Sequence, residues 1–271
     1  MFKLDEDILR TYFRLEEYQR QRLWMERLWH PELMKWVKRG APPPITPTKR
    51  IRQEELAKMG FDENYYQRML EGENACHREL KELVELHPLW PHFERMPGFS
   101  YYLCGAFIAA GGDIQRAPTG SAFWKGMGLD VLPDGTAPRR IKGKTKNVER
   151  RIPALPHVTR VGEQIRPQLV RSNPFGYRLY LVHKKDYLTR YPEKPLMFAH
   201  KHGQRISQKI LYFCLWREWR LAYGLPAPDP YAFDILKHDD GSMIRISDFY
   251  EQKKKKASQH VGATELAGEP E

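Results

Sequence analysis

The sequence predicts a mainly α-helical protein, in which an N-terminal, coiled-coil-like helical arm precedes a helical domain that contains a helix-hairpin-helix. Two observations support this fold class. Apolar residues recur at intervals of three or four along most of the chain, which is the spacing of one face of a helix. Proline and glycine cluster between these stretches, where helices end. We expect the arm at residues 1–85, the domain at 86–240 and a disordered basic tail at 241–271.

The composition is that of a globular protein with a basic surface. Of the 271 residues, 41% are hydrophobic and 29% are charged, and the net charge is +11. A positive excess of this size favours a polyanionic partner, most often nucleic acid. The three cysteines, Cys76, Cys104 and Cys214, include no CxxC pair. They are therefore interpreted as core residues in a reducing compartment, and neither a zinc ribbon nor a disulfide framework is indicated.

We expect a cytoplasmic protein without a membrane segment. The N-terminus, MFKLDEDILR, is too acidic and polar for a signal peptide, and no run of about 18 apolar residues occurs. The sequence also contains no Walker A loop, GxGxxG, HExxH, GxSxG or EF-hand pattern.

The arm is predicted from the helical spacing of apolar residues over 4–38, with Arg and Glu alternating on the other face. The proline-rich linker at 40–47, GAPPPITP, cannot continue a helix. Helical spacing resumes over 52–59 and 62–87, with Asp62 as an N-cap. We expect these helices to pair as an arm or partial coiled coil, through which the protein forms a homo-oligomer.

A hairpin is predicted at MPGFS, residues 96–100, before a helix over 101–110 that is rich in small residues. Gly98 can adopt a positive φ without steric cost, so the chain can turn there. Backbone N–H groups of such a hairpin and of the next helix N-terminus can face a DNA phosphate without reading the base sequence. Pro97, Gly98 and Ser100 are therefore candidate DNA-binding residues. The alternative is an ordinary corner between two helices, because Pro-Gly turns are common.

The densest basic run of the chain follows a turn at 133–136. Against the single acid Glu149, it contains seven cations: Arg139, Arg140, Lys142, Lys144, Lys146, Arg150 and Arg151. Lysine and arginine displace condensed counterions from DNA, so all seven are candidate DNA-binding residues. The alternative is a solvated basic loop.

Four helices are predicted after the basic run, at 158–169, 177–191, 205–223 and 230–236. The third is the most apolar and is expected to be a core helix. From residue 251 the chain has few hydrophobic residues, which is typical of a disordered tail.

Three histidines, His183, His200 and His202, suggest a metal site in this region. An HxH pair binds metal well on a strand, where both rings share a face. No carboxylate or cysteine neighbour completes a ligand set here, so we predict no metal.

Several stretches taken together resemble one protein family. Between residues 86 and 236 they are, in order, HPLWPHFERMPGF, GGDI, FWKGMGL, DGTAPRRIKGK, HKHGQRISQKIL and GLPAPDPYAFDIL. Their order and spacing resemble the C-terminal transposase domain of the insertion-sequence 110/116/902 transposases, relatives of the Piv/MooV DNA invertases. The resemblance implies DNA transposition or site-specific recombination. It also implies double-stranded DNA as a partner and a structured guide RNA as a further partner.

The nuclease site that this resemblance implies is not evident. Members of the family carry an N-terminal RuvC-like domain with four acidic metal ligands, whereas residues 1–92 have helical spacing. Asp5, Glu6 and Asp7 form the only early acidic cluster, and they lie at a helix start. We therefore predict no cofactor, with Mg²⁺ needed only if a separate nuclease domain or partner takes part.

The serine nucleophile of the family is not evident either. It is expected shortly after Gly128-Leu129, where Thr136 is the only hydroxyl, and no activating base is evident. Ser121 and Ser172 lie outside this window. We therefore predict no catalytic residue, and the resemblance alone leaves enzymatic activity undecided.

Three hypotheses remain from the sequence. The first is a DNA-binding protein of the transposase family in which a nuclease centre is not evident. The second is a non-catalytic module, derived from such a transposase, that binds DNA or guide RNA or serves in assembly. The third, a repair protein similar to a glycosylase, requires a catalytic Asp or Lys next to the hairpin, and Asp113 is interpreted instead as a helix cap.

Overall fold

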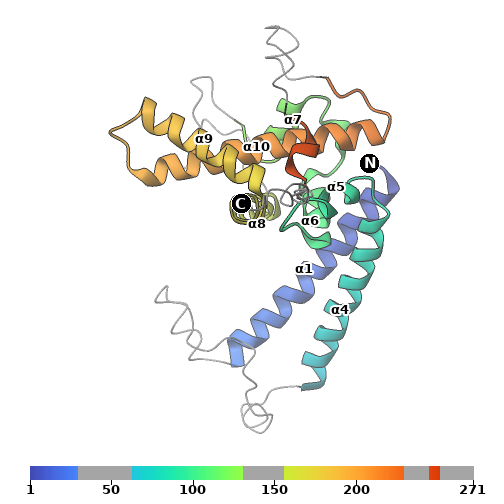
Figure 1. The fold of residues 1–271 in the computed structure, drawn as a ribbon. Coiled ribbons are helices and arrows are strands. Elements are labelled where there is room, and N and C mark those ends of the chain that lie inside the picture. The colour runs from blue at the N-terminus through green and yellow to red at the C-terminus, as the bar shows by residue number, and fades with distance from the viewer. Residues whose placement is uncertain (30–62, 131–155, 229–243, 251–271) are drawn as a thin grey trace, which may run out of the picture.

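A computed structural model describes four stretches of the chain, residues 1–29, 63–130, 156–228 and 244–250 (Figure 1). All regular secondary structure in these stretches is helical, which confirms the predicted mainly α fold. It consists of eight α-helices and two short 3-10 helices. None of these helices combines the length and the apolar composition needed to traverse a lipid bilayer.

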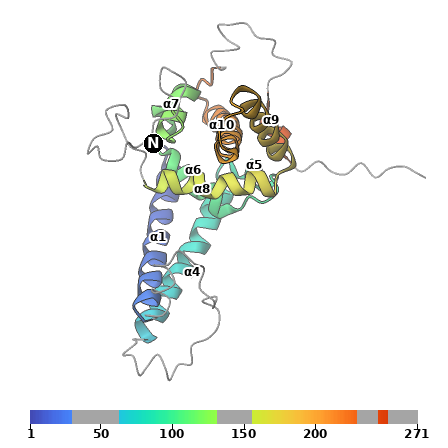
Figure 2. The same ribbon diagram turned by 90° about the vertical axis from the view of Figure 1, so that its left-hand side faces the viewer.

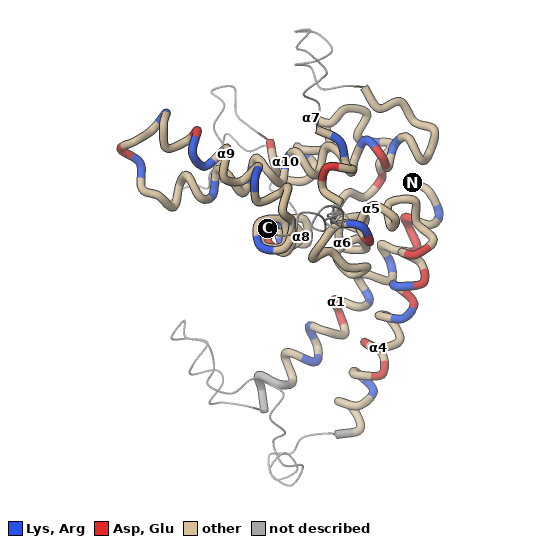
Figure 3. Tube along the Cα trace, in the orientation of Figure 1, with Lys and Arg blue, Asp and Glu red and all other residues tan. Residues whose placement is uncertain are grey.

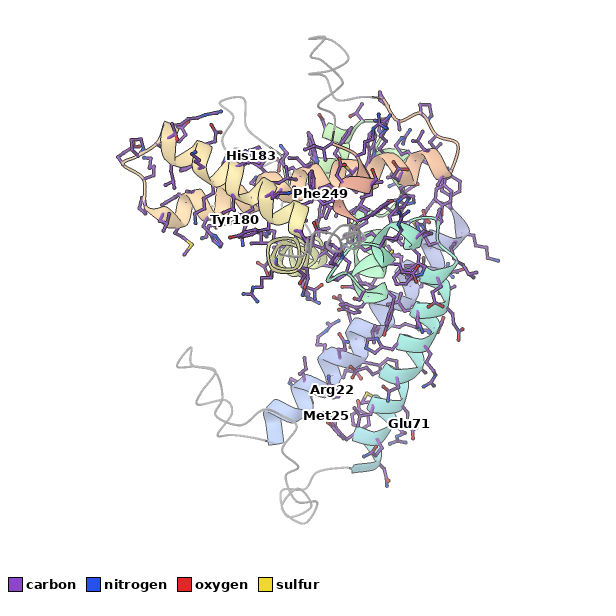
Figure 4. All side chains as sticks on the ribbon, in the orientation of Figure 1. Arg22, Met25, Glu71, Tyr180, His183 and Phe249 are labelled. Atoms are coloured by element: carbon purple, nitrogen blue, oxygen red, sulfur yellow. The ribbon has the colours of Figure 1, made fainter. Side chains whose placement is uncertain are left out.

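The arm consists of two antiparallel helices that run side by side away from the rest of the molecule (Figures 1 and 2), α1 (Lys3–Trp29) and α4 (Glu63–Glu85). The apolar spacing of α1 has the predicted effect, because Ile8, Tyr12 and Leu15 are all fully buried. Toward the free end of the arm, Arg22 and Met25 lie on α1, and Glu71 lies on the facing helix (Figure 4). The predicted linker at 40–47 and the predicted helix at 52–59 lie outside the described residues.

Four short elements follow the arm: α5 (Trp90–Glu94), α6 (Tyr101–Gly111), η1 (Ile114–Arg116) and α7 (Gly120–Gly126). Seven consecutive residues of α6, from 103 to 109, are buried, because its small side chains let neighbouring helices approach. A Cβ at Gly105, for example, would lie 2.9 Å from Leu80 of α4. The predicted cap at Asp113 is confirmed, since its side chain accepts a hydrogen bond from the backbone N–H of Gln115 (3.2 Å) at the start of η1.

The longer helices of the second half are α8 (Pro156–Arg171), α9 (Pro174–Arg190) and α10 (Leu196–Ala222). α9 and α10 form an antiparallel hairpin whose far end projects from the body of the molecule (Figure 1). α10 begins at Leu196, so the prediction that the helix starts at residue 205 was wrong. Its first turns bury the small residues Ala199 and Gly203 and therefore lack the apolar spacing on which that prediction depended.

A single buried core joins the arm to the second half of the chain. Its largest side chains are Tyr12, Phe93, Phe107, Tyr212, Trp216, Trp219 and Phe249. The three cysteines are free and buried, as their interpretation as core residues predicted. The short helix η3 (Ile246–Phe249) lies within the range expected to form a disordered tail, yet both of its terminal residues are buried in this core.

A buried polar network connects the start of α1 with the segment after α4 and the end of α10. Asp5 Oδ1 accepts hydrogen bonds from His87 Nε2 (3.0 Å) and from the Tyr223 hydroxyl (2.5 Å). The backbone N–H of Leu89 donates to His87 Nδ1 (3.1 Å), so Nε2 is the nitrogen that carries the proton. Burial, and then the hydrogen bond to Asp5, raise the pKa of Tyr223. Asp5 and His87 are each 1% exposed, so this network fixes the arm to the body and is closed to an external ligand.

Candidate nucleic-acid interface

Positive charge is concentrated in the second half of the described chain (Figure 3). Residues 156–228 contain 13 lysines and arginines against four acidic residues, whereas α1 and α4 together contain nine against 12. Two ion pairs join the helices of the arm, that of Arg14 with Glu79 and that of Arg22 with Glu73 (2.6 Å). Arg160 of α8 also pairs with Glu16 of α1, but α8, α9 and α10 still carry more cations than carboxylates, and this excess is suited to an anionic partner.

A tight turn lies between α5 and α6, at residues 96–100, where the hairpin was predicted. Gly98 has a φ of 82°, the positive value that the turn requires, and Ser100 caps α6 by accepting a hydrogen bond from the backbone N–H of Leu103 (3.4 Å). Gly98 and Ser100 are exposed and Pro97 is half-buried. One side of Gly98 nevertheless lies against α8, where an added Cβ would overlap the side chain of Ser172. The turn is therefore confirmed, and contact of these three residues with phosphate stays a prediction.

The predicted basic run at 139–151, with all seven of its cations, lies outside the described residues. The structure does describe the residue from which the chain leaves toward it. The backbone carbonyl of Asp130 accepts a hydrogen bond from Arg205 of α10 (2.6 Å). The chain therefore departs toward the basic run from a point beside α10.

Three cations lie along the side of α10 that faces away from α9. Lys201, Arg205 and Lys209 are spaced by four residues, which places them on one side of the helix. Gly203, about half a turn away, faces α9, since a Cβ there would lie 2.7 Å from the carbonyl oxygen of Tyr180. At about 1.5 Å of rise per residue, the three cations span about 12 Å. We call Lys201, Arg205 and Lys209 the α10 stripe.

The α10 stripe ends on an aromatic ring of α7. Lys209 Nζ lies 4.5 Å from the ring centre of Trp124, whose Nε1 donates a hydrogen bond to the Lys209 carbonyl (2.9 Å). Burial, and then repulsion from Arg205, lower the pKa of Lys209, while the carboxylate of Asp130 opposes the shift. An anion bound here would relieve the repulsion between the two neighbouring cations. Lys209 and Arg205 are thus two neighbouring cations, and the carboxylate of Asp130 already acts on Lys209.

The histidines that suggested a metal site lie in the α9–α10 hairpin but do not form such a site. His200 Nδ1 lies 2.8 Å from the hydroxyl of Tyr180, and the ring of His202 lies 4.9 Å from that of Tyr187. Across the described stretches, no three His, Cys, Asp or Glu side chains are grouped so that they could hold a metal ion. These histidines contribute to a partly aromatic contact between α9 and α10.

The acidic and hydroxyl side chains considered for catalysis lie in separate surroundings. Asp5 belongs to the buried network, and Glu6 forms an exposed ion pair within α1. Ser121 is exposed on α7, whereas the hydroxyl of Ser172 donates to Gln168 (3.2 Å) at the end of α8. These residues do not assemble a nucleophile with its base.

Reasoning from the sequence missed the α10 stripe because the predicted helix began at residue 205, after His200, Lys201 and His202. The signal was present in HKHGQRISQK, where the three cations recur at intervals of four. Trp124 was noticed only as part of the FWKGMGL stretch, since the sequence does not show that α7 packs against α10.

No family model, curated protein or solved structure matches this chain. The residues and geometry described above are therefore the basis for a functional proposal.

Proposed function

We propose that this chain binds the phosphate backbone of double-stranded DNA through the α10 stripe and the basic run at 139–151. The observation that carries the proposal is the four-residue spacing of three cations on one side of α10, beside the point from which the chain departs toward that run. Cations placed in this way displace condensed counterions, so binding is strong at low salt and carries little sequence information.

The length of the stripe favours duplex DNA over duplex RNA. Three cations that span about 12 Å along a helix match the width of the B-DNA major groove, which is also about 12 Å. The two ends of the stripe can then reach phosphates on opposite walls of that groove. The major groove of A-form RNA is deep and narrow, so the same fit does not arise there. Structured RNA is the second candidate, because the resemblance to the transposases implies a guide RNA.

The same resemblance favours a role in DNA transposition or site-specific recombination. The alternative is a non-catalytic binding or assembly module. A cleavage assay on DNA ends with Mg²⁺ distinguishes the two roles, because cleavage by this chain supports the first and binding without cleavage supports the second.

The proposal is tested by measuring affinity for duplex DNA and structured RNA over a series of salt concentrations. We expect the variant K201A/R205A/K209A to lose about 10- to 100-fold in affinity near 0.1 M salt. Its salt slope should fall by about two to three, since each lost phosphate contact lowers the slope by about 0.9. The variant R139A/R140A/K142A/K144A should show a similar loss of affinity relative to the wild-type protein.

The matched control is R10A/R20A/K81A, which removes three exposed cations from the arm and changes the net charge equally. This control should retain nearly the affinity and slope of the wild-type protein. If it weakens binding as much as the stripe variant does, net charge alone drives the association and the assigned surface is wrong. Tighter and equally salt-dependent binding to structured RNA would make RNA the ligand.

A further inference from the structure

The end of the α9–α10 hairpin exposes apolar side chains. Tyr191, Leu196 and Met197 are 46%, 61% and 58% exposed, respectively, and we call these three residues the hairpin tip. Seven of the 14 large hydrophobic residues that are exposed in the described stretches lie between positions 177 and 198. Exposed apolar side chains grouped within the turn at the end of a hairpin indicate a contact site.

The tip is held in one conformation by its own backbone. The N–H of Lys194 donates to the Tyr191 carbonyl (3.1 Å), and the N–H of Phe198 donates to the Pro195 carbonyl (2.9 Å). Pro192 and Pro195 restrict φ on both sides of the turn. Little conformational entropy is therefore lost when the exposed side chains of the tip meet a partner.

The tip is continuous with the α10 stripe. Met197 precedes Lys201 by four residues, so it extends the line of the three cations on the same side of α10. Lys201 is exposed, and Lys194 is exposed within the turn itself. A duplex held by the stripe therefore meets apolar side chains with cations on either side of them.

We propose that the hairpin tip inserts between neighbouring base pairs of the duplex held by the α10 stripe and so recognises DNA whose base stacking is weak or already broken. This inference rests on the function proposed above. Apolar wedges of this kind separate base steps and kink the duplex, and the protein surface gained by the bend offsets the cost of unstacking. That cost is smallest where a base is unpaired or mismatched, which gives the protein a preference for such sites.

The test uses a duplex that carries 2-aminopurine next to one unpaired base, the site that the tip is proposed to prefer, since 2-aminopurine fluoresces more strongly when it is unstacked. At saturating protein the wild type should raise the fluorescence severalfold, and the tip variant L196A/M197A should lose most of this increase. The wild type should also bind a duplex with one unpaired base about tenfold more tightly than an intact duplex, and the tip variant should lose that preference. Its salt slope should stay that of the wild type, because the cations are unchanged.

The matched control is L181A/V182A, which removes two exposed apolar side chains from α9 outside the tip and should behave as the wild type does. If wild-type protein binds with a steep salt slope but leaves the fluorescence unchanged, the insertion is wrong and the DNA-binding function stands. If wild-type protein does not bind duplex DNA, both proposals fail. If the tip variant instead changes the oligomeric state and retains the fluorescence increase, the tip is a protein contact and the insertion is likewise wrong.

Discussion

The arm and the α9–α10 hairpin are both antiparallel helix pairs, yet they differ in how their charges are distributed. In the arm, Arg14 contacts Glu79 and Arg22 contacts Glu73 across the two helices, and the totals of the two signs nearly cancel. In the hairpin, the cations of α10 lie away from the facing helix, and ion pairs such as that of Arg190 with Asp186 stay within one helix. Opposite charges thus pair between the two helices of the arm, whereas the cations of the α10 stripe lie on the side of α10 that faces away from α9.

The two pairs also differ in what brings the helices together. A Cβ at Gly72 in the arm would meet the ring of Tyr18, the movable end of a side chain (2.5 Å). A Cβ at Gly203 in the hairpin would meet the backbone carbonyl of Tyr180 (2.7 Å), which cannot rotate away. The hairpin therefore depends on close backbone approach, and the arm depends on side chains that can adjust.

The largest effect is expected where the arm joins the body, at Asp5. We predict that Asp5→Ala lowers the free energy of unfolding by about 3 kcal/mol, because both the His87 N–H and the Tyr223 hydroxyl lose their buried acceptor. Asp5→Asn keeps an oxygen acceptor and should cost less. The measurement is urea unfolding, with Glu6→Ala as a control that breaks an exposed pair worth under about 0.5 kcal/mol. Equal losses for Asp5→Ala and Glu6→Ala would show that the joint is not fixed by this network.

The second-largest effect on stability is expected at Gly203 of the hairpin, and Gly72 of the arm serves as the comparison. Gly203→Ala should lower the free energy of unfolding by about 1–3 kcal/mol, since the hairpin must open to accept the methyl group. Gly72→Ala should stay within about 1 kcal/mol of the wild type, because the gain in helix propensity offsets the displacement of Tyr18. Thermal unfolding of the two variants side by side measures the difference. If both glycines tolerate alanine equally, the contrast in packing between the two helix pairs is wrong.

Much of the helical fold was predictable because the apolar residues of a long amphipathic helix recur at intervals of three or four. The apolar face of α1 and the core-facing half of α10 followed from residues at intervals of three and four, and the turn at Gly98 followed from its glycine. The first turns of α10 were not predictable in this way. They pack through Ala199 and Gly203, and small residues give no hydrophobic period.

The candidate site was harder to predict than the fold. Pro97, Gly98 and Ser100 were correctly placed at a turn, but the sequence gives no sign that Gly98 lies against α8. The proximity of Lys209 to Trp124 joins residues 85 positions apart and depends on how α7 packs against α10. Contacts of this kind join segments that are distant in the sequence. They depend on tertiary packing, which the spacing of residues within one segment does not predict.

A smaller effect concerns the ion pairs of the arm. The pair of Arg22 with Glu73 is mostly buried, with side-chain exposures of 22% and 12%, so Glu73→Ala should lower the free energy of unfolding by about 1–2 kcal/mol. The pair of Arg20 with Glu17 is exposed, and Glu17→Ala should cost under about 0.5 kcal/mol. Unfolding at low and high salt should show a loss that depends on salt for the exposed pair. If Glu73→Ala is as harmless as Glu17→Ala, cross-helix pairing does not stabilise the arm.

The smallest effect concerns pH and the hairpin histidines. Burial lowers the pKa of His183 and His202 below the usual 6.5, and Arg190 lowers both further, against the opposing effect of Asp186. As the pH falls through 6.5, the unfolded chain therefore takes up protons before the folded one does. The free energy of unfolding should therefore be higher near pH 7.5, where both rings are neutral in the folded and the unfolded chain, than at pH 5.5. The decrease should be under about 1 kcal/mol, because solvent partly screens both rings. Urea unfolding of the wild type and of H183Q/H202Q at these two pH values measures the difference.

The same two histidines should have the opposite effect on DNA binding. A bound phosphate favours the protonated ring, so the affinity of the wild type for duplex DNA should rise as the pH falls from 7.5 to 5.5 while its stability declines. Both trends should flatten in H183Q/H202Q. If the variant loses the trend in stability but keeps the trend in affinity, the two histidines serve packing alone and do not contact the bound phosphate.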